Sequence, residues 1–132
     1  MTVQELSQLY YLNREIEMDQ RRLKELEGRL GPVSPKITGM PKGTRIDSNM
    51  DHLVAEIVDI QALIAAKQLQ CIHERNRLER YIESIADSEM RIMFTLRFVN
   101  GLSWNQVAAH MGDGYVADSL KKKCYRYLRS GQ

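Results

Sequence analysis

Apolar side chains in the first thirty residues follow the period of an amphipathic helix. They recur every seven positions, with a second, interleaved series, as Leu9, Ile16, Leu23, Leu30, Leu12 and Leu26. Thr2 and Glu5 form a capping-box sequence in front of this series. The pattern predicts a helix from about residue 3 to residue 29. Asp19 stands where the interleaved series calls for an apolar residue, so the stripe is imperfect.

A longer helix is predicted from residue 47 to residue 86, where the sequence contains neither proline nor glycine. One apolar series continues through this stretch at seven-residue spacing, as Met50, Ile57, Ile64, Cys71, Leu78 and Ile85. The interleaved series is interrupted by Lys67 and Glu74, which weakens the apolar stripe in the middle. Repeats sustained over this length are typical of coiled-coil helices that pack on another helix.

Residues 31–46 hold all three prolines and cannot continue either helix. They form a basic linker or crossing loop whose Lys36, Lys42 and Arg45 either touch phosphates or are simply solvated. An antiparallel hairpin follows, with helices of roughly 40 and 55 Å at about 1.5 Å per residue. The surplus end of the longer helix must pack on the C-terminal segment or on a second copy of the chain.

The last third of the chain predicts three short helices. The first follows cap candidates at residues 86–89 and ends at Gly101, a glycine suited to a left-handed C-cap. Ser103 and Gln106 form a second capping box, which begins a helix of about two turns closed by Gly112. A final helix begins between residues 115 and 117 and continues to about residue 129. A short helix, a glycine turn and a second helix are the parts of a helix-turn-helix.

Positive charge collects on the last helix. Residues 117–132 contain five cations and one acid, a net charge of +4 in a chain of net charge +2. Several cations on one face supply affinity for phosphates through counterion release. The candidate DNA-binding residues are Ser103, Asn105, Gln106, Tyr115, Asp118, Ser119, Lys121, Lys122, Lys123, Arg126 and Arg129. Base contacts are expected from the first turns of the last helix, at Tyr115, Asp118, Ser119 and Lys122.

Two structural alternatives compete with this interpretation. A basic helix face can be solvated without any partner, and a helical hairpin also needs small residues and a turn. Trp104 either anchors the short helix against the helix before it or stacks on nucleic acid.

The segment "MRIMFTLRFVNGLSWNQVAAHMG" at residues 90–112 resembles the C-terminal helix-turn-helix of sigma factors. Their shared pattern is an apolar helix ending in Leu-Arg-aromatic, a Gly-x-Ser-aromatic entry, and a short helix that ends in Met-Gly or Leu-Gly. With the proline-rich run at residues 32–43, the chain is most similar to phage-encoded, sigma-factor-like regulators of late-gene transcription, the ArpU/RinA-like family. The resemblance implies DNA binding linked to transcription of phage or prophage genes, with RNA polymerase as a possible partner.

After Gly112 the chain departs from the sigma pattern, because "DGYVADSLKKK" replaces the expected Ser-x-x-Thr-Val. The base-reading positions are therefore not carried over from the family. No sigma core-binding regions are visible, so autonomous sigma activity is not expected.

No catalytic constellation, metal site or cofactor motif is present in the sequence. His52, His73 and His110 lie on separate segments, without partners at metal-ligand spacing. Cys71 and Cys124 fall on apolar helical positions, which predicts reduced, packed thiols. No run is apolar enough for a membrane span, so an intracellular protein is expected. The resemblance implies the cytoplasm of a bacterial host cell. Without a catalytic constellation, the protein is not expected to be an enzyme.

The sequence therefore predicts an all-α fold with a coiled-coil-like antiparallel hairpin over residues 1–86 and a small three-helix helix-turn-helix unit over residues 87–132. The favoured function is a duplex DNA-binding regulator of phage or prophage transcription, oligomeric through the long helices, with a dimer favoured. A small-terminase-like DNA-packaging protein and a helical interaction module without DNA binding are the alternatives.

Overall fold

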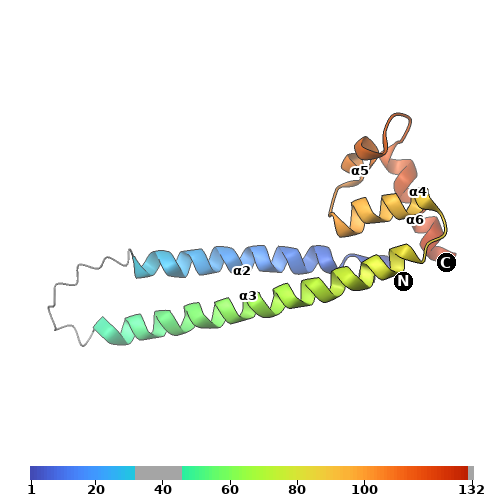
Figure 1. Ribbon diagram of the computed structural model, residues 1–132. Helices are drawn as coiled ribbons and strands as arrows, with labels where there is room; N and C mark the ends of the chain where they lie inside the picture. The colour runs from blue at the N-terminus through green and yellow to red at the C-terminus, as the bar shows by residue number, and fades with distance from the viewer. Residues whose placement is uncertain (32–45, 131–132) are drawn as a thin grey trace. The chain divides into compact units, whose positions relative to one another are not determined.

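The chain is all-helical within the part that the structure describes (Figure 1). The computed structural model describes residues 1–31 and 46–130, with side chains in 1–31 and 50–130. Its helices are α1 (Val3–Leu6), α2 (Gln8–Leu30), α3 (Ile46–Glu83), α4 (Ser88–Phe94), the π-helical turn η1 (Thr95–Val99), α5 (Trp104–Met111) and α6 (Ala117–Arg129). α2 and α3 pack antiparallel, as predicted. The expected basic loop, including Lys36, Lys42 and Arg45, lies outside the described residues.

The predicted helix boundaries hold to within a few residues. The first helix is interrupted at Ser7, which separates α1 from α2. Thr2 caps α1, since its side chain accepts a hydrogen bond from the Glu5 backbone N–H at 3.1 Å. α3 ends three residues before the expected position, because the amides of Ser84 and Ile85 each bond a carbonyl three residues back and so tighten the last turn.

Packing divides the chain into two compact units. The hairpin unit consists of Arg14–Leu69, and the C-terminal unit consists of Met1–Asn13 together with Gln70–Gln132. The hairpin unit therefore contains most of α2 and the first part of α3. The C-terminal unit contains the short helices, the first residues of α2 and the part of α3 that begins at Gln70.

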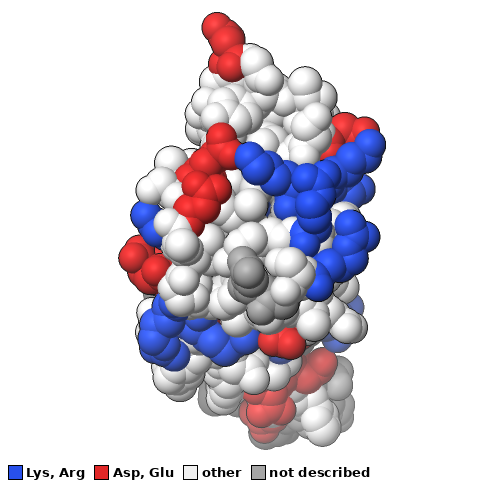
Figure 2. All heavy atoms as spheres, turned by 90° about the vertical axis from the view of Figure 1, so that its right-hand side faces the viewer, with Lys and Arg blue, Asp and Glu red and all other residues white. Residues whose placement is uncertain are grey.

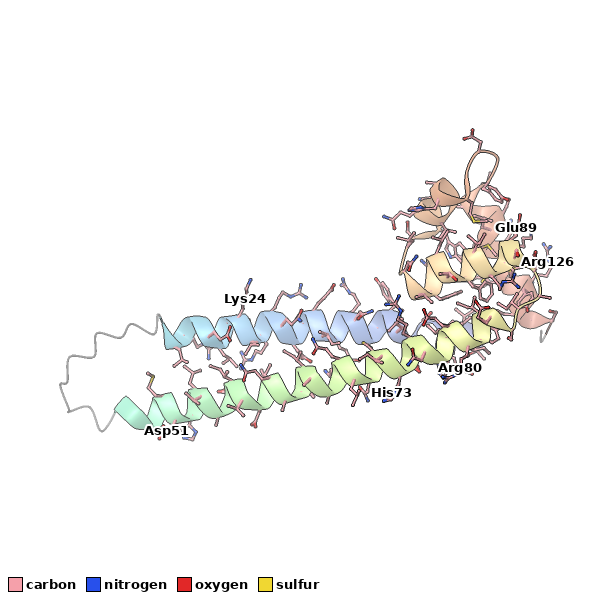
Figure 3. The ribbon with its side chains drawn as sticks, viewed as in Figure 1. Lys24, Asp51, His73, Arg80, Glu89 and Arg126 are labelled. Carbon is pink, nitrogen blue, oxygen red and sulfur yellow. The ribbon has the colours of Figure 1, made fainter. Side chains whose placement is uncertain are left out.

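The hairpin unit is held by one row of apolar side chains along each helix. The buried side chains among its described residues are Ile16 and Leu26 of α2 and Ile57 and Ile64 of α3. Leu26 belongs to the interleaved apolar series that the sequence predicted, and the other three belong to the main seven-residue series. Side chains on the far sides point to solvent, as Lys24 of α2 and Asp51 of α3 show in Figure 3.

The polar interruptions of the two stripes meet in this unit. Lys67 Nζ lies 2.7 Å from Asp19 Oδ2 and 3.1 Å from Glu15 Oε1. The side chains of Lys67 and Asp19 are only 18% and 21% exposed, so this ion pair lies at the seam and is shielded from water on most sides. The two carboxylates that bond the ammonium group raise the pKa of Lys67, Asp19 more strongly than Glu15.

The C-terminal unit has a continuous apolar core that joins the long helices to the short ones. Its buried members come from the long and the short helices and the segments beside them, and are Leu6, Leu9, Leu78, Ile82, Ile85, Met90, Met93, Phe94, Phe98, Val107, Leu120 and Cys124. Leu78 and Ile82 belong to the surplus end of α3, and Ile85 lies just beyond it. This end therefore packs on the C-terminal segment, the first of the two expected solutions. Phe94 lies at the centre. The ring centroids of Tyr81, Phe98 and Tyr127 lie within 6.3 Å of the ring centroid of Phe94.

The helix that begins at α4 continues as the π-helical turn η1, a feature that the sequence did not predict. Thr95 Oγ1 bonds the carbonyl of Arg91 at 2.8 Å, a bond that bends helices by competing with the backbone ladder. The Asn100 amide then bonds the carbonyl of Thr95, five residues back, at 2.9 Å. Gly101 ends the helix with φ of 72°, the left-handed conformation expected of it.

Candidate nucleic-acid interface

The entrance to α5 is fixed by the capping box that the sequence predicted. Ser103 Oγ accepts from the Gln106 amide at 3.2 Å, and Gln106 Oε1 accepts from the Ser103 amide at 2.9 Å. Both bonds satisfy amides that a helix start leaves unpaired. Asn105, in the first turn, is exposed. Ser103, Asn105 and Gln106 thus lie together at the N-terminus of α5, where backbone amides and the helix dipole favour anions.

The turn between α5 and α6 depends on two glycines. Gly112 and Gly114 have φ values of 110° and 89°, which side chains with a Cβ rarely adopt. On either side of this turn, Val107 and Leu120 are buried in the same core, and α5 and α6 are in contact. The structure therefore forms the short helix, glycine turn and second helix that the sequence predicted.

α6 separates an apolar face from a basic one. Leu120 and Cys124 are buried, and burial raises the pKa of the Cys124 thiol to about 12. Lys122, Arg126 and Arg129 lie on the opposite side and are exposed. Figure 2 shows a face of the C-terminal unit on which Lys and Arg side chains gather.

Most of these cations are not neutralised within the protein. Lys122 Nζ lies 3.8 Å from Asp118 Oδ2, and both side chains are more than 70% exposed, so this pair is weak. Lys121 Nζ lies over the ring of Tyr125 at 5.8 Å from its centre. Among the described residues, no acidic side chain forms an ion pair with Lys121, Arg126 or Arg129.

Two of the predicted site residues are instead held by Glu89, in the first turn of α4. The Tyr115 hydroxyl donates to Glu89 Oε2 at 2.9 Å, and Lys123 Nζ bonds Glu89 Oε1. The lysine and, secondarily, the tyrosine lower the pKa of Glu89, and Glu89 raises the pKa of both Lys123 and Tyr115. The carboxylate thus ties the turn and the side of α6 to α4.

Besides the cations Lys121, Arg126 and Arg129 of α6, the predicted site residues fall into three groups. Asp118 and Ser119 in the first turn of α6 are exposed beside Lys122, which keeps them available for base contacts. Ser103, Asn105 and Gln106 form the second group at the start of α5. Tyr115 and Lys123 form the third, through Glu89. Sequence reasoning missed Glu89 as a member of the site, and its one signal was its position in the first turn of a helix, where it passed for a capping acid.

Trp104 packs against the apolar core of the C-terminal unit, which agrees with the anchoring alternative. The guanidinium carbon of Arg97 lies 5.1 Å from the centre of its ring, and Arg97 donates to the Leu102 carbonyl at 2.8 Å. Arg97 thereby joins η1 to the start of α5. This arginine is the second residue that sequence reasoning did not place in the site.

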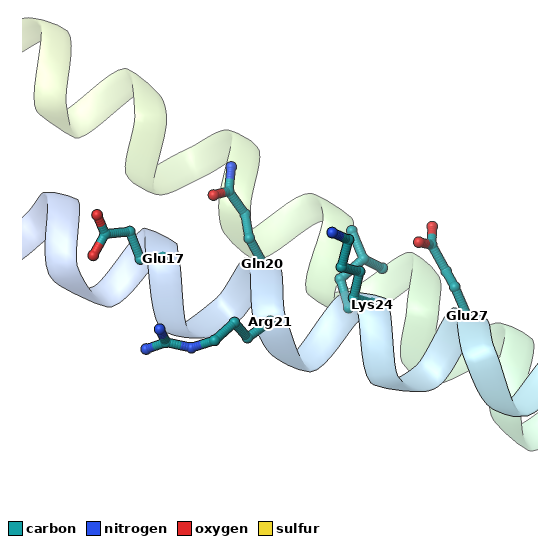
Figure 4. Close-up of a pocket in the computed structure, with 6 residues that line it drawn as sticks. Glu17, Gln20, Arg21, Lys24 and Glu27 are labelled. Carbon is teal, nitrogen blue, oxygen red and sulfur yellow. The ribbon is translucent and has the colours of Figure 1, made fainter.

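The hollow in Figure 4 offers no comparable site. It follows the solvent side of α2 and is lined by Glu17, Gln20, Arg21, Leu23, Lys24 and Glu27. Two acids and two bases are mixed there, as on a solvated helix face. The described residues contain no group of His, Cys, Asp and Glu that could hold a metal ion, and neither Cys71 nor Cys124 forms a disulfide. None of the described helices is long and apolar enough to cross a membrane.

Comparison with known proteins adds no relative, since no family model, curated protein or solved structure matches the chain.

Proposed function

We propose that this protein binds duplex DNA through α5 and α6, with α6 as the recognition helix. The observation that carries the proposal is the outer face of α6, where Lys122, Arg126 and Arg129 stand exposed while the opposite face is buried in a compact core. A helix that is supported from behind and basic in front is what a helix-turn-helix presents to the major groove.

Within this proposal the residues have separate roles. Lys122, Arg126 and Arg129 neutralise phosphates, and Asp118 and Ser119 contact base edges from the first turn of α6. The N-terminus of α5, with Ser103, Asn105 and Gln106, binds a backbone phosphate. Glu89 bonds Tyr115 and Lys123 and so keeps Lys123 away from phosphate. These roles make the protein a binding protein rather than an enzyme.

The resemblance of residues 90–112 to the sigma-factor helix-turn-helix favours a transcriptional role over DNA packaging. We accordingly propose regulation of phage or prophage genes as the biological context, with contact to RNA polymerase as part of it. Recovering fragments of the source genome that the protein binds tests this step: one discrete site upstream of a gene supports regulation, and enrichment at a packaging site contradicts it.

The DNA-binding proposal is tested by titrating labelled duplex DNA at low and moderate salt. We expect the variant Lys122→Ala/Arg126→Ala/Arg129→Ala to bind more weakly and to flatten the slope of log K against log salt by roughly 3, about 0.9 for each lost phosphate contact. The matched control Arg14→Ala/Arg21→Ala/Lys24→Ala removes equal charge from α2 and should leave the slope within about one contact of wild type. Equal losses in both variants would contradict the proposal.

A further inference from the structure

α3 carries a second row of apolar side chains that does not face α2. This outer stripe repeats at spacings of three and four residues and consists of Ala55, Val58, Ala62, Ala65, Leu69 and Ile72. At about 100° per residue, it is turned by roughly 140° around the helix from the row that contains Ile57 and Ile64. Val58, Leu69 and Ile72 are 55%, 55% and 56% exposed.

The far side of α2 is different in character. It carries charged residues, among them Arg14, Arg21 and Glu25. Its exposed large apolar side chains include Tyr10, Tyr11 and Met18. In α3, by contrast, residues 60–66 contain no charged side chain at all. A helix segment that is apolar on all sides is normally buried on all sides, and α2 covers only one of them.

We propose that the outer stripe of α3 packs antiparallel against the outer stripe of a second copy of this chain. In that arrangement the stripe residues meet in three kinds of pair. Ala55 lies opposite Ile72 of the second copy, and Val58 lies opposite Leu69 of the second copy. Ala62 meets Ala65 of the second copy at the centre, where two alanines allow the helices to approach closely. All six side chains of each copy thus face one shared apolar seam.

Charge at the ends of the stripe favours the antiparallel direction. Asp51 and Arg80 lie on the outer side of α3, beyond opposite ends of the stripe, and neither forms an ion pair among the described residues. Antiparallel pairing places Asp51 four residues, about 6 Å along the helix axis, from Arg80 of the second copy. Parallel pairing would instead place acid beside acid and arginine beside arginine, which is unfavourable.

The size of the seam sets the expected strength. The stripe covers 18 residues, about 27 Å of helix. One helix face of this length, roughly 10 Å wide, offers about 300 Å², which is less than the roughly 800 Å² per partner typical of stable complexes. We therefore expect a reversible dimer that dissociates in the micromolar range. The inference does not depend on DNA binding, because it uses no residue of α5 or α6.

Sedimentation equilibrium across the micromolar range tests the proposal. Wild type should dimerise, and Val58→Glu/Leu69→Glu should weaken dimerisation at least about tenfold, since two charges would enter an apolar seam. The matched control Tyr11→Glu/Met18→Glu places the same charges on the far side of α2 and should dimerise as wild type does. Equal helicity by circular dichroism shows that all three proteins are folded. A monomeric wild type, a dimeric stripe variant or an equally weakened control would overturn the proposal.

Cysteine cross-linking tests the direction. In the antiparallel pair, position 58 lies 11 residues, about 16 Å, from position 58 of the second copy, too far for a disulfide. Val58→Cys alone should therefore stay uncross-linked, whereas Val58→Cys/Leu69→Cys should form a covalent dimer linked from position 58 to position 69. The wild type controls for Cys71 and Cys124. A covalent dimer of the single variant, or none of the double, would refute the antiparallel arrangement.

Discussion

The hairpin unit and the C-terminal unit are both helical, yet they bury side chains in different ways. Of the eight largest fully buried side chains, seven belong to the C-terminal unit and only Leu26 belongs to the hairpin unit. The hairpin unit has one apolar row per helix and an ion pair at its seam. The C-terminal unit surrounds Phe94 with side chains from the ends of the long helices and from the short helices.

The C-terminal unit supplies a closed core behind α6. The function proposed for α6 requires such a support, because a recognition helix must be held in place. Two helices alone bury one side each, and the remaining sides stay available for a partner. The next three variants separate these two kinds of packing.

The largest effect is expected from Phe94→Ala. Phe94 is fully buried among three aromatic rings, so its truncation leaves a cavity and should lower the free energy of unfolding by about 3–5 kcal/mol. Urea denaturation followed by circular dichroism measures the loss. Ile92→Ala serves as the control on the same helix, because Ile92 is 54% exposed and its truncation should cost less than about 1 kcal/mol. Similar losses in the two variants would contradict the described core.

A smaller effect is expected at the seam of the hairpin unit. Lys67→Ala leaves Asp19 without its partner beside Glu15, and should lower the free energy of unfolding by about 1–2 kcal/mol. Asp19→Leu/Lys67→Leu should recover the loss, because an apolar pair fits an apolar seam. Arg14→Ala, which removes an exposed pair with Glu17, should have an effect of at most about 0.5 kcal/mol.

The pH dependence of the seam has a definite sign. Since the pKa of Lys67 is raised in the folded protein, its contribution is fully present below the ordinary value of 10.5 and is lost as the pH rises through the folded value. The difference between wild type and Lys67→Ala should therefore shrink in strongly alkaline buffer. A difference that persists unchanged there would mean that the ion pair does not stabilise the seam.

The smallest effect is expected from Glu89→Gln, and it connects packing with binding. The substitution releases Lys123 from its carboxylate partner and should tighten duplex DNA binding about threefold at low salt, as one more cation reaches phosphate. Glu83→Gln, which changes the net charge equally at an exposed position of α3, is the control. Equal gains in both variants would show an effect of net charge alone.

Thermal unfolding of the same variant has a predicted pH window. The pKa of Glu89 is lowered from 4.5, so its stabilising contact is present above that value and is lost as the pH falls through the folded value. Wild type should unfold at a higher temperature than Glu89→Gln at neutral pH, and the two should converge in acid. Unfolding temperatures that stay apart in acid would argue against the contact between Glu89 and Lys123.

Much of the fold could be predicted from the sequence, because the decisive signals are local. The seven-residue series fixes the long helices, and Ser103 with Gln106 fixes the start of α5. Gly101 and Gly112 mark the helix ends at which positive φ is required. Each signal lies within one or two turns of the element it determines, so no knowledge of tertiary packing is needed.

The features that were missed depend on contacts between distant residues. Asp19 and Lys67 look like two separate defects until the antiparallel register brings them to 2.7 Å. Glu89 reaches residues 26 and 34 positions away, which no periodicity encodes. The turn η1 arises where the Thr95 hydroxyl bonds a carbonyl of the preceding turn, a choice that depends on the rotamer of that side chain.

The grouping of Leu6, Leu9 and Leu78 with the short helices is another contact between distant segments. A boundary at residue 86 follows from the end of the apolar series, whereas Leu6, Leu9 and Leu78 pack in the same core as the short helices. The N-terminal residues and the end of α3 therefore belong to the core that supports α6. The candidate DNA-binding residues themselves were chosen from charge and turn position, and their assignment remains a proposal.

The burial of Cys124 has a chemical consequence for the same helix. Only a thiolate attacks alkylating reagents or is readily oxidised, and a thiol whose pKa lies near 12 keeps its proton at cellular pH. Cys124 therefore becomes reactive only when α6 leaves its place. The rate at which a thiol reagent modifies Cys124 therefore measures how often α6 opens.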